Sequence, residues 1–475
     1  MKRSALKSAL RLVVKNLVPY CVEDAYVRRR YGKAGYFDGL DALEGGGVVA
    51  RTIRAALPYG LVMALRRRRF RTPSASEHQA DFPRVVALLR ERLLSGGRLR
   101  ALFLVADESM FPAAPLCRAM SEDASFEPIV AVVPDFRHAA RDVLPRMERC
   151  ERSLAASFPS VRMLRLRPLR NGDWPDVLGE TDVVCYPTPH DSSFVRYCIR
   201  YSAGRDVLPI HVNYGYYRSV YDRAVMSGEN YAHFWKVFFE CDETMKEYTE
   251  HSILRGGNAE LSGYVKMDDL ALKSSAPRTR KRILVALHHS VEGGKNERLS
   301  LANIVRLADF FLSLPGRYRG VDFVFRPHPF LVETLSREDV WGAERTRAYF
   351  SQLRSQANVV WSDGPDYFQT FADSDACIQD CGSYLVEYLY TGRPCCYILK
   401  SPSDVEAKFA PLGRKCLDAC HIAYDAGDID AFIRKVVLAG EDDKAAARRA
   451  LLPSIAVNYP HASIVALNAI KKDLS

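Results

Sequence analysis

Short apolar runs rich in β-branched residues alternate with longer polar stretches from residue 99 onward. The apolar runs have the length of buried strands, and the stretches that separate them, such as 112–122 and 139–158, have the pattern of helices. Before residue 240 the predicted strands are 100–105, 128–133, 161–166, 182–186, 209–212 and 237–239. Alternation of this kind predicts βαβ units and a parallel sheet with helices on both faces.

The alternation pauses at 270–281, a polar stretch that contains serine and proline, and then resumes. The second series of predicted strands comprises 282–287, 322–325, 358–361, 376–379 and 394–399. The pattern therefore predicts an α/β chain with two doubly wound Rossmann-type domains. We place the first domain over 73–270, a linker over 271–281, and the second domain with its C-terminal helices over 282–475.

Residues 1–72 precede the alternation and form a basic arm. Residues 1–71 hold 16 Lys and Arg against 5 Asp and Glu, and the rest of the chain holds 51 against 52, so the net charge of +10 lies in the arm. Apolar residues at positions 6, 10, 13, 14 and 17 recur with a helical period among Lys and Arg. Such a helix suits an anionic membrane surface. The alternative is a helix that packs on its own protein or binds acidic polymers.

The arm is not expected to cross a bilayer or to direct secretion. The apolar run at 55–65 covers about half of the roughly 20 residues that a spanning helix needs, and no small-residue cleavage site follows an apolar region. We therefore expect a cytoplasmic protein that is peripheral on the inner face of the cytoplasmic membrane. The near-neutral body, without interleaved aromatic and basic residues, argues against nucleic acid as a partner.

The composition is that of a soluble globular protein, with 475 residues, 48% hydrophobic and 26% charged, which excludes a disordered chain. The twelve cysteines include no CxxC pair, and several lie in or beside predicted strands, where free cysteine packs as a small hydrophobe. Zinc ligation by Cys377 and Cys381, or by Cys416, Cys420 and His421, is the alternative. We expect no metal and no resident cofactor.

Polar clusters follow the predicted strands of the second domain, where ligands bind in open parallel sheets. The first comprises His288, His289 and Ser290, followed by a glycine pair at 293–294. Glycine amides can approach a phosphate closely, and a protonated histidine would supply charge or a proton. The alternative is a solvated loop whose histidines are incidental.

The second cluster is the Arg-Pro-His-Pro turn that contains Arg326 and His328. Arginine can hold phosphate oxygens in a bidentate manner, and two prolines stiffen the turn. The third comprises Asp380, Gly382, Ser383 and, within the next helix, Glu387. Ser383 is predicted to cap that helix and make an anion site, and Glu387 could accept ribose hydroxyls. The alternative is a capped helix with a solvated Glu387.

The fourth cluster lies in the first domain, at the end of strand 209–212. His211, Tyr214 and Gly215 could act there on an acceptor hydroxyl, in a loop expected to face the other clusters across a cleft. A single histidine in an apolar strand is equally well explained as a satisfied core residue. The sequence contains no GxGxxG, Walker, HExxH or GxSxG motif, which argues against the commonest dinucleotide, P-loop, zinc-peptidase and α/β-hydrolase functions.

Over roughly 205–400 these motifs resemble the CDP-glycerol glycerophosphotransferase family, which makes teichoic-acid-type polyol-phosphate polymers of the cell envelope. The resemblance rests on Tyr214-Gly215, the 263–268 stretch (GYVKMD), the RPHP turn, and Asp380 to Ser383 continuing to Glu387. It implies a GT-B fold, with two Rossmann domains around a nucleotide cleft, and a metal-independent transferase with a CDP-linked donor. It also implies that Arg326 and His328 bind the donor diphosphate, and that Asp380, Ser383 and Glu387 hold phosphate and ribose.

The chain departs from the family pattern, so we interpret it as a divergent member. Where the family polymerases have Trp-His-Gly, with that histidine as the base, this sequence has Asn213-Tyr214-Gly215. The base could then be His211, His288 or His289. We expect transfer of a polyol-phosphate or glycosyl group to a hydroxyl of a lipid-linked or cell-surface glycan. The alternatives are a UDP- or CMP-sugar glycosyltransferase of surface polysaccharide synthesis, a hydrolase with a metal on the histidines and Asp380, and a noncatalytic membrane-associated scaffold.

Deletion of residues 1–71 tests the membrane role of the arm. Because the deletion removes the excess positive charge, we expect the protein to move from the membrane to the soluble fraction while nucleotide binding is retained. Fractionation of both forms, followed by immunoblotting, measures the shift. An unchanged distribution would contradict this role.

Overall fold

The computed structural model describes residues 74–135, 140–169, 174–189, 195–219, 228–291, 300–364 and 366–475, together with positions 56–58, 61, 193, 222 and 226. Apart from 56–58 and 61, the predicted basic arm lies outside the described residues. No helix in the described part of the chain is both long and apolar enough to cross a membrane.

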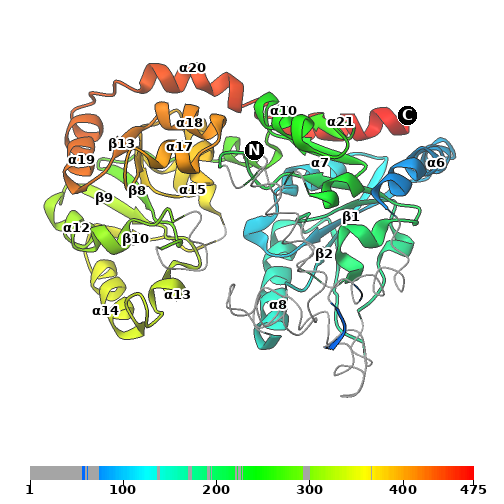
Figure 1. Ribbon diagram of the computed structural model, residues 1–475, viewed down its shortest axis with the longest axis horizontal. Helices are drawn as coiled ribbons and strands as arrows, with labels where there is room; N and C mark the ends of the chain where they lie inside the picture. The colour runs from blue at the N-terminus through cyan, green and yellow to red at the C-terminus, as the bar shows by residue number, and fades with distance from the viewer. Residues whose placement is uncertain are drawn as a thin grey trace. The chain divides into compact units, whose positions relative to one another are not determined.

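The first sheet has seven strands in the order β3-β2-β1-β4-β5-β6-β7 (Figure 1). Its central pairs, from β3 through β5, are parallel. The strands are β1 Leu99–Val105, β2 Phe126–Val132, β3 Arg162–Leu164, β4 Val183–Cys185, β5 Leu208–Val212, β6 Lys236–Phe239 and β7 Ala259–Leu261. The helices nearest to it in sequence are α6 Ala75–Leu94, α7 Ala114–Glu122, α8 Ala140–Ser157, α10 Asp242–His251 and α11 Asp268–Ala271.

The second sheet has six parallel strands in the order β10-β9-β8-β11-β12-β13. The strands are β8 Lys281–Ala286, β9 Val321–Phe325, β10 Val359–Trp361, β11 Ala376–Gln379, β12 Cys395–Ile398 and β13 His421–Ala423. The helices that follow β8 in sequence are α12 Ile304–Arg317, α13 Leu331–Leu335, α14 Ala343–Arg354, α15 Tyr367–Ala372, α16 Tyr384–Glu387, α17 Asp404–Lys408, α18 Pro411–Asp418, α19 Ala426–Ala431, α20 Ala445–Ile455 and α21 Ala462–Leu474.

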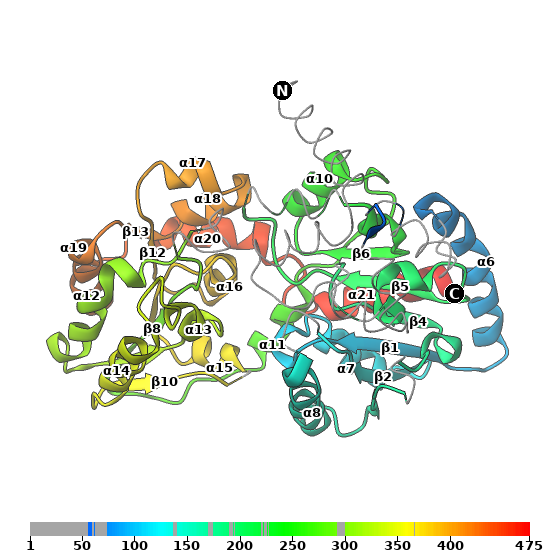
Figure 2. The same ribbon diagram turned by 60° about the horizontal axis from the view of Figure 1, so that its bottom comes forward.

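The second sheet is covered on both faces, as Figure 2 shows. Successive side chains of a strand point to opposite faces: Ile283 and Val285 of β8 pack with α12, α14 and α19 in one hydrophobic core, and Leu284 and Ala286 pack with α15, α16 and α18 in the other. Burial on both faces explains why these strands are continuous apolar runs in the sequence.

The two-sheet α/β architecture expected from the sequence is confirmed. The eleven predicted strands overlap β1 to β6 and β8 to β12, with ends that differ by up to two residues. The sequence analysis missed β7 and β13. Each has three residues, one of them polar (Glu260 in β7 and His421 in β13), so neither strand is a continuous apolar run.

Contacts divide the chain into two compact units, but not at a single point. The first comprises Met1–Tyr214, Glu229–Val237 and Leu467–Ser475, and the second comprises Gly215–Gly228 and Phe238–Ala466. Residues 215–228 and 238–270, which we expected to belong to the first domain, therefore group with the second unit, whereas residues 229–237 stay with the first.

Gly263 is required where the chain leaves β7. Its φ is +87°, and a Cβ there would lie 2.0 Å from the carbonyl oxygen of Val457. Five residues later, the Asp268 carboxylate accepts the amides of Ala462 and Ser463 at the start of α21 (3.1 and 2.8 Å). The glycine thus allows a close approach to the segment between α20 and α21, and the aspartate holds the start of α21.

Replacement of Gly263 by alanine tests this packing. We expect Gly263→Ala to lower the free energy of unfolding by about 2 kcal/mol or more, because strain at positive φ is added to a backbone clash. The matched control is Gly392→Ala, since Gly392 also has positive φ (+68°) but nothing within 4 Å of a Cβ. Urea unfolding compares the two variants, and equal losses would contradict a role for the clash.

A buried pair of histidines joins α6 to the 3₁₀ turn Glu229–His233 in the first unit. The Nδ1 atoms of His78 and His233 lie 3.2 Å apart. Burial lowers the pKa of His78 to about 3, with a further contribution from His233 against the opposing charge of Asp81. Burial lowers the pKa of His233 to about 4. The charge of Arg200 adds to this effect, and the charge of Glu229 opposes it.

This pair predicts acid instability of the first unit. The folded pKa values lie below the unfolded value of about 6.5, so stability is complete above that pH and is lost as pH falls toward 4. At pH 5 the loss for one histidine reaches about 2 kcal/mol. We expect His78→Phe to flatten the dependence of the melting temperature between pH 7 and pH 4.5. His251→Phe, on the exposed face of α10, should leave the slope unchanged, and a slope unaffected by His78→Phe would refute the assignment.

Candidate functional site: the carboxyl edge of the second sheet

Three of the clusters predicted from the sequence meet at the carboxyl edge of the second sheet. His288 and His289 follow β8, Arg326 and His328 follow β9, and Asp380 follows β11. The strand order β9-β8-β11 places the end of β8 in the middle. Adjacent strands lie about 4.8 Å apart, so side chains from the three ends can reach one ligand.

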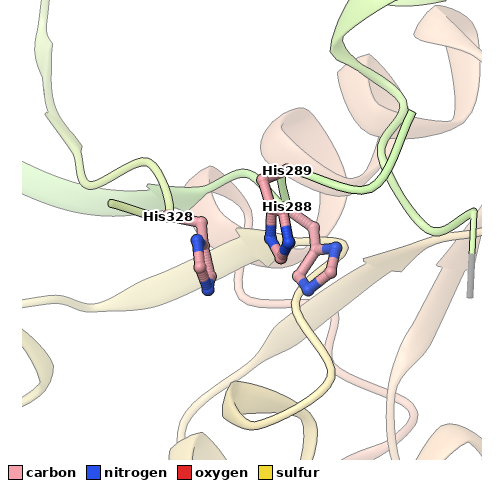
Figure 3. Close-up of side chains that lie close together, drawn as sticks. All are labelled: His288, His289 and His328. Carbon is pink, nitrogen blue, oxygen red and sulfur yellow. The ribbon is translucent and has the colours of Figure 1, made fainter. Parts of the chain in front are cut away.

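His288, His289 and His328 form one cluster of imidazole rings (Figure 3). The ring centroids of His289 and His328 lie 4.0 Å apart, and those of His288 lie 4.5 Å from His289 and 5.3 Å from His328. Phe330 packs 5.6 Å from His328 and 5.8 Å from His289, centroid to centroid. The second loop thus provides an aromatic support for two of the histidines.

Two of these rings are held in the same tautomer by the same local motif. The amide of Ser290 donates to Nδ1 of His288 at 3.1 Å, and the amide of Phe330 donates to Nδ1 of His328 at 3.2 Å. A backbone N–H can only donate, so Nδ1 is the acceptor in each ring and the neutral ring carries its hydrogen on Nε2. His288 and His328 therefore present N–H groups at Nε2.

Both rings are neutral at physiological pH. Burial, followed by the neighbouring His289, His328 and Arg218, lowers the pKa of His288 well below its usual value. Burial and His289 lower the pKa of His328 to about 3. The expectation that a protonated histidine supplies charge here is therefore wrong for these two residues, which are uncharged hydrogen-bond donors. A ring with its hydrogen on Nε2 and an occupied Nδ1 cannot act as a general base either.

The three histidines also satisfy the spacing of a metal site, because one ligand atom from each lies within 4.8 Å of the others. A metal-bound imidazole coordinates through one nitrogen and donates a hydrogen bond from the other. In His288 and His328 the other nitrogen, Nδ1, accepts a hydrogen bond instead. This donor set suits an anion better than a cation. The eleven cysteines that the structure describes are free and buried.

Arg326 carries the positive charge of the site. Its guanidinium donates to three neutral oxygens, those of Tyr384 Oη (3.1 Å), Ser362 Oγ (2.8 Å) and the Gly364 carbonyl (2.5 Å), and lies 5.6 Å from the ring centroid of Tyr367. No carboxylate of the described residues forms an ion pair with it. These contacts fix the plane of the guanidinium and leave its charge for a ligand.

Asp380 is fully buried and holds the edge together. Its Oδ1 accepts the amide of His288 at 2.6 Å, and its Oδ2 accepts the amide of Asn303 at 2.6 Å. Burial raises the pKa of Asp380 to about 7, against the opposing effect of these hydrogen bonds. Because both oxygens are occupied, the role in donor binding implied by the resemblance is not available to Asp380 here, and it positions His288.

Glu387 is also turned inward. Its carboxylate accepts hydrogen bonds from Tyr264 Oη (3.0 Å) and Tyr367 Oη (2.7 Å), and Lys266 Nζ lies 3.9 Å away. The side chain is 2% exposed, so it does not offer oxygens to a ribose. It holds Tyr367, the ring beside Arg326.

Ser383 and Gly382 occupy the turn after β11. Ser383 stands at the start of the four-residue helix α16, but its side chain makes no capping hydrogen bond, so the predicted cap is not formed. Gly382 leaves room for Arg218, because a Cβ there would lie 3.2 Å from Nε of that arginine. Ser290, predicted to bind the donor, instead orients His288, with its Oγ 2.7 Å from Nδ1.

The first-domain cluster separates into a core residue and a loop. His211 is buried, with Nδ1 3.1 Å from the carbonyl oxygen of Tyr186 and its ring stacked on Phe234 at 5.2 Å. These contacts favour the core interpretation over the proposed base. Tyr214 is exposed, and the division of the chain into its units falls between Tyr214 and Gly215.

The sequence analysis missed Arg218, Tyr384 and Ser362. Arg218 follows the Tyr-Gly loop and reaches Gly382, and the other two hold Arg326. Arg218 has a recognisable signal, because it is a basic residue three positions after a predicted acceptor loop. No sequence signal marks Tyr384 and Ser362, because their contacts with Arg326 depend on how the segments after β10 and β11 pack beside the end of β9.

No protein-family model and no curated protein matches the sequence. Among solved structures, a putative UDP-N-acetylglucosamine 2-epimerase from Listeria monocytogenes matches with a TM-score of 0.50 and 11% identity over 79% of this chain and 96% of that one. The UDP-GlcNAc 2-epimerase from Neisseria meningitidis bound to UDP-GlcNAc matches at 0.50 and 12%, over 79% and 100%. The wall teichoic acid polymerase TagF matches at 0.50 and 10%, over 79% and 89%.

At 10–12% identity these likenesses establish the fold alone. The resemblance to the glycerophosphotransferases stays a prediction from the sequence motifs. The chain thus has a GT-B-like fold, with the three histidines and Arg326 at the carboxyl edge of its second sheet.

Proposed function

We propose that this protein is a transferase that moves a polyol-phosphate or glycosyl group from a nucleotide-activated donor to a hydroxyl of a lipid-linked or cell-surface glycan acceptor. One observation carries the proposal. Two neutral histidines, His288 and His328, are fixed as Nε2–H donors at the same sheet edge as Arg326, with which no described carboxylate forms an ion pair. Such a set of donors suits the negative charge that develops on a departing nucleotide.

The arrangement is preorganised for group transfer. Phosphoryl transfer needs positioning and electrostatic stabilisation more than covalent chemistry from the protein. Backbone amides set the direction of the two Nε2–H groups, and Tyr384, Ser362 and the Gly364 carbonyl set the direction of Arg326. The donors therefore need not reorganise as charge builds on the leaving group. Neither a metal nor a cofactor is part of this proposal, and a CDP-linked donor is favoured by the motif resemblance.

We assign the proton acceptor to His289. Of the three histidines considered from the sequence, His211 lies in the core of the first unit, and the tautomer of His288 excludes proton uptake at Nε2. His289 is only partly buried and packs at 4.0 Å on the ring of His328. A partly exposed imidazole at the site can remove the hydroxyl proton of an acceptor. The basic arm would bring the enzyme to the membrane that carries that acceptor.

Transfer assays with a panel of donors test the proposal. Full-length protein is incubated with CDP-glycerol, CDP-ribitol, UDP-sugars and a CMP-sugar, together with lipid-linked acceptors. We expect one class of donor to be used, and we expect His328→Ala to lower kcat/KM by roughly 10²- to 10³-fold, as removal of an oxyanion donor does. His289→Ala should lower kcat with little change in KM.

The exposed residue His251 on α10 provides the control, and His251→Ala should retain full activity. Undiminished transfer by His328→Ala would refute its assigned role. Failure of the wild type to bind any nucleotide would favour a scaffold. Chelator-sensitive activity would favour a metal-dependent hydrolase.

A further inference from the structure

Arg218 reaches the carboxyl edge of the second sheet from a segment that follows β5 of the first. Its backbone is pinned within the second unit, where the amide of Ala410 donates to its carbonyl oxygen at 2.9 Å. The amides of Arg218 and Ser219 also donate to the carboxylate of Asp222, at 3.1 and 2.9 Å. These contacts determine where the arginine side chain begins and in which direction it extends.

The guanidinium of Arg218 lies against the backbone of Gly382. Its Nη1 donates to the carbonyl oxygen of Tyr216 at 2.9 Å, and a Cβ on Gly382 would lie 3.2 Å from Nε and 3.5 Å from Nη2. Asp222, 3.6 Å from Nη1, balances part of the charge, and the side chain is 24% exposed. The absence of a side chain at Gly382 thus allows this guanidinium to approach the turn after β11 closely.

The strand order places Arg218 opposite Arg326. Arg326 follows β9 and Gly382 follows β11, while His288 follows β8, which lies between those two strands. The axes of β9 and β11 are about 10 Å apart, so two arginine side chains can converge from either side on a ligand above β8. The positive charge of Arg218 contributes to the lowered pKa of His288, consistent with this proximity.

We propose that Arg218 is a second cationic arm of the anion site and that the ligand carries two linked phosphoryl groups. A single phosphate can engage one guanidinium closely, whereas a diphosphate can engage both, with the Nε2–H groups of His288 and His328 beneath it. The proposal rests on the proposed use of this site for a phosphate-bearing donor. What it adds is the residue that would engage the second phosphoryl group of such a donor, Arg218.

Calorimetric titration of the full-length protein with pyrophosphate and with orthophosphate tests the proposal, and CDP and CMP serve as a second pair. We expect wild type to bind pyrophosphate at least about tenfold more tightly than orthophosphate, because a second charge-assisted contact is made. Arg218→Gln should reduce that preference to within about threefold while orthophosphate affinity is retained. Arg326→Gln should weaken both ligands.

Gly382→Ala gives an independent measurement, because its Cβ displaces the guanidinium without removing the charge. It should reduce the preference for pyrophosphate as Arg218→Gln does, and it decides the matter if Arg218→Gln fails to fold. The control is Arg317→Gln. Arg317 is an exposed arginine at the C-terminal end of α12, whereas the N-terminal end of that helix lies at the site. This substitution should leave the preference for pyrophosphate unchanged.

An unchanged preference in folded Arg218→Gln or Gly382→Ala, or no binding of either anion by wild type, would overturn the assignment. The outcome is separable from that of the transfer assay. A preference that depends on Arg218 in a protein without transferase activity would support the diphosphate site and refute the proposed reaction.

Discussion

The carboxylate of Asp380 is the constraint on which the site depends. Asp380 follows β11. Its carboxylate accepts hydrogen bonds from the amide of His288, which follows β8, and from the amide of Asn303 at the start of α12, each at 2.6 Å. A buried carboxylate with its oxygens satisfied by backbone N–H groups joins segments that are distant in sequence. Because the amide of His288 is one of these donors, the same hydrogen bond fixes the backbone that carries the His288 ring and the position of β8 relative to β11.

Charge and hydrogen bonding are supplied by different residues at this edge. His288 and His328 are neutral and give direction through Nε2–H groups, whereas Arg326, and in our proposal Arg218, supply the positive charge. Burial explains the division, since it lowers the pKa of an imidazole but leaves a guanidinium charged. An anion can then be bound without a protonation step in the histidines.

Several motif residues whose side chains could bind a ligand instead have structural roles. Glu387 accepts from Tyr264 and Tyr367, and Tyr367 packs beside Arg326. Gly263 packs against the backbone of Val457, and Asp268 holds the start of α21. A motif that two sequences have in common can therefore indicate a common fold as readily as a common ligand, because both require particular residues at fixed intervals.

The sequence by itself determined the architecture, because strands buried on both faces must be continuous apolar runs. It also located His288, His328 and Arg326 at strand ends. Only the tertiary structure decided which polar groups face a ligand. Asp380 and Glu387 are turned inward, His211 belongs to a core, and Arg218 arrives from the segment after β5. The reason is physical: strand pattern depends on local periodicity, whereas tautomer, burial and charge balance depend on neighbours that are distant in the chain.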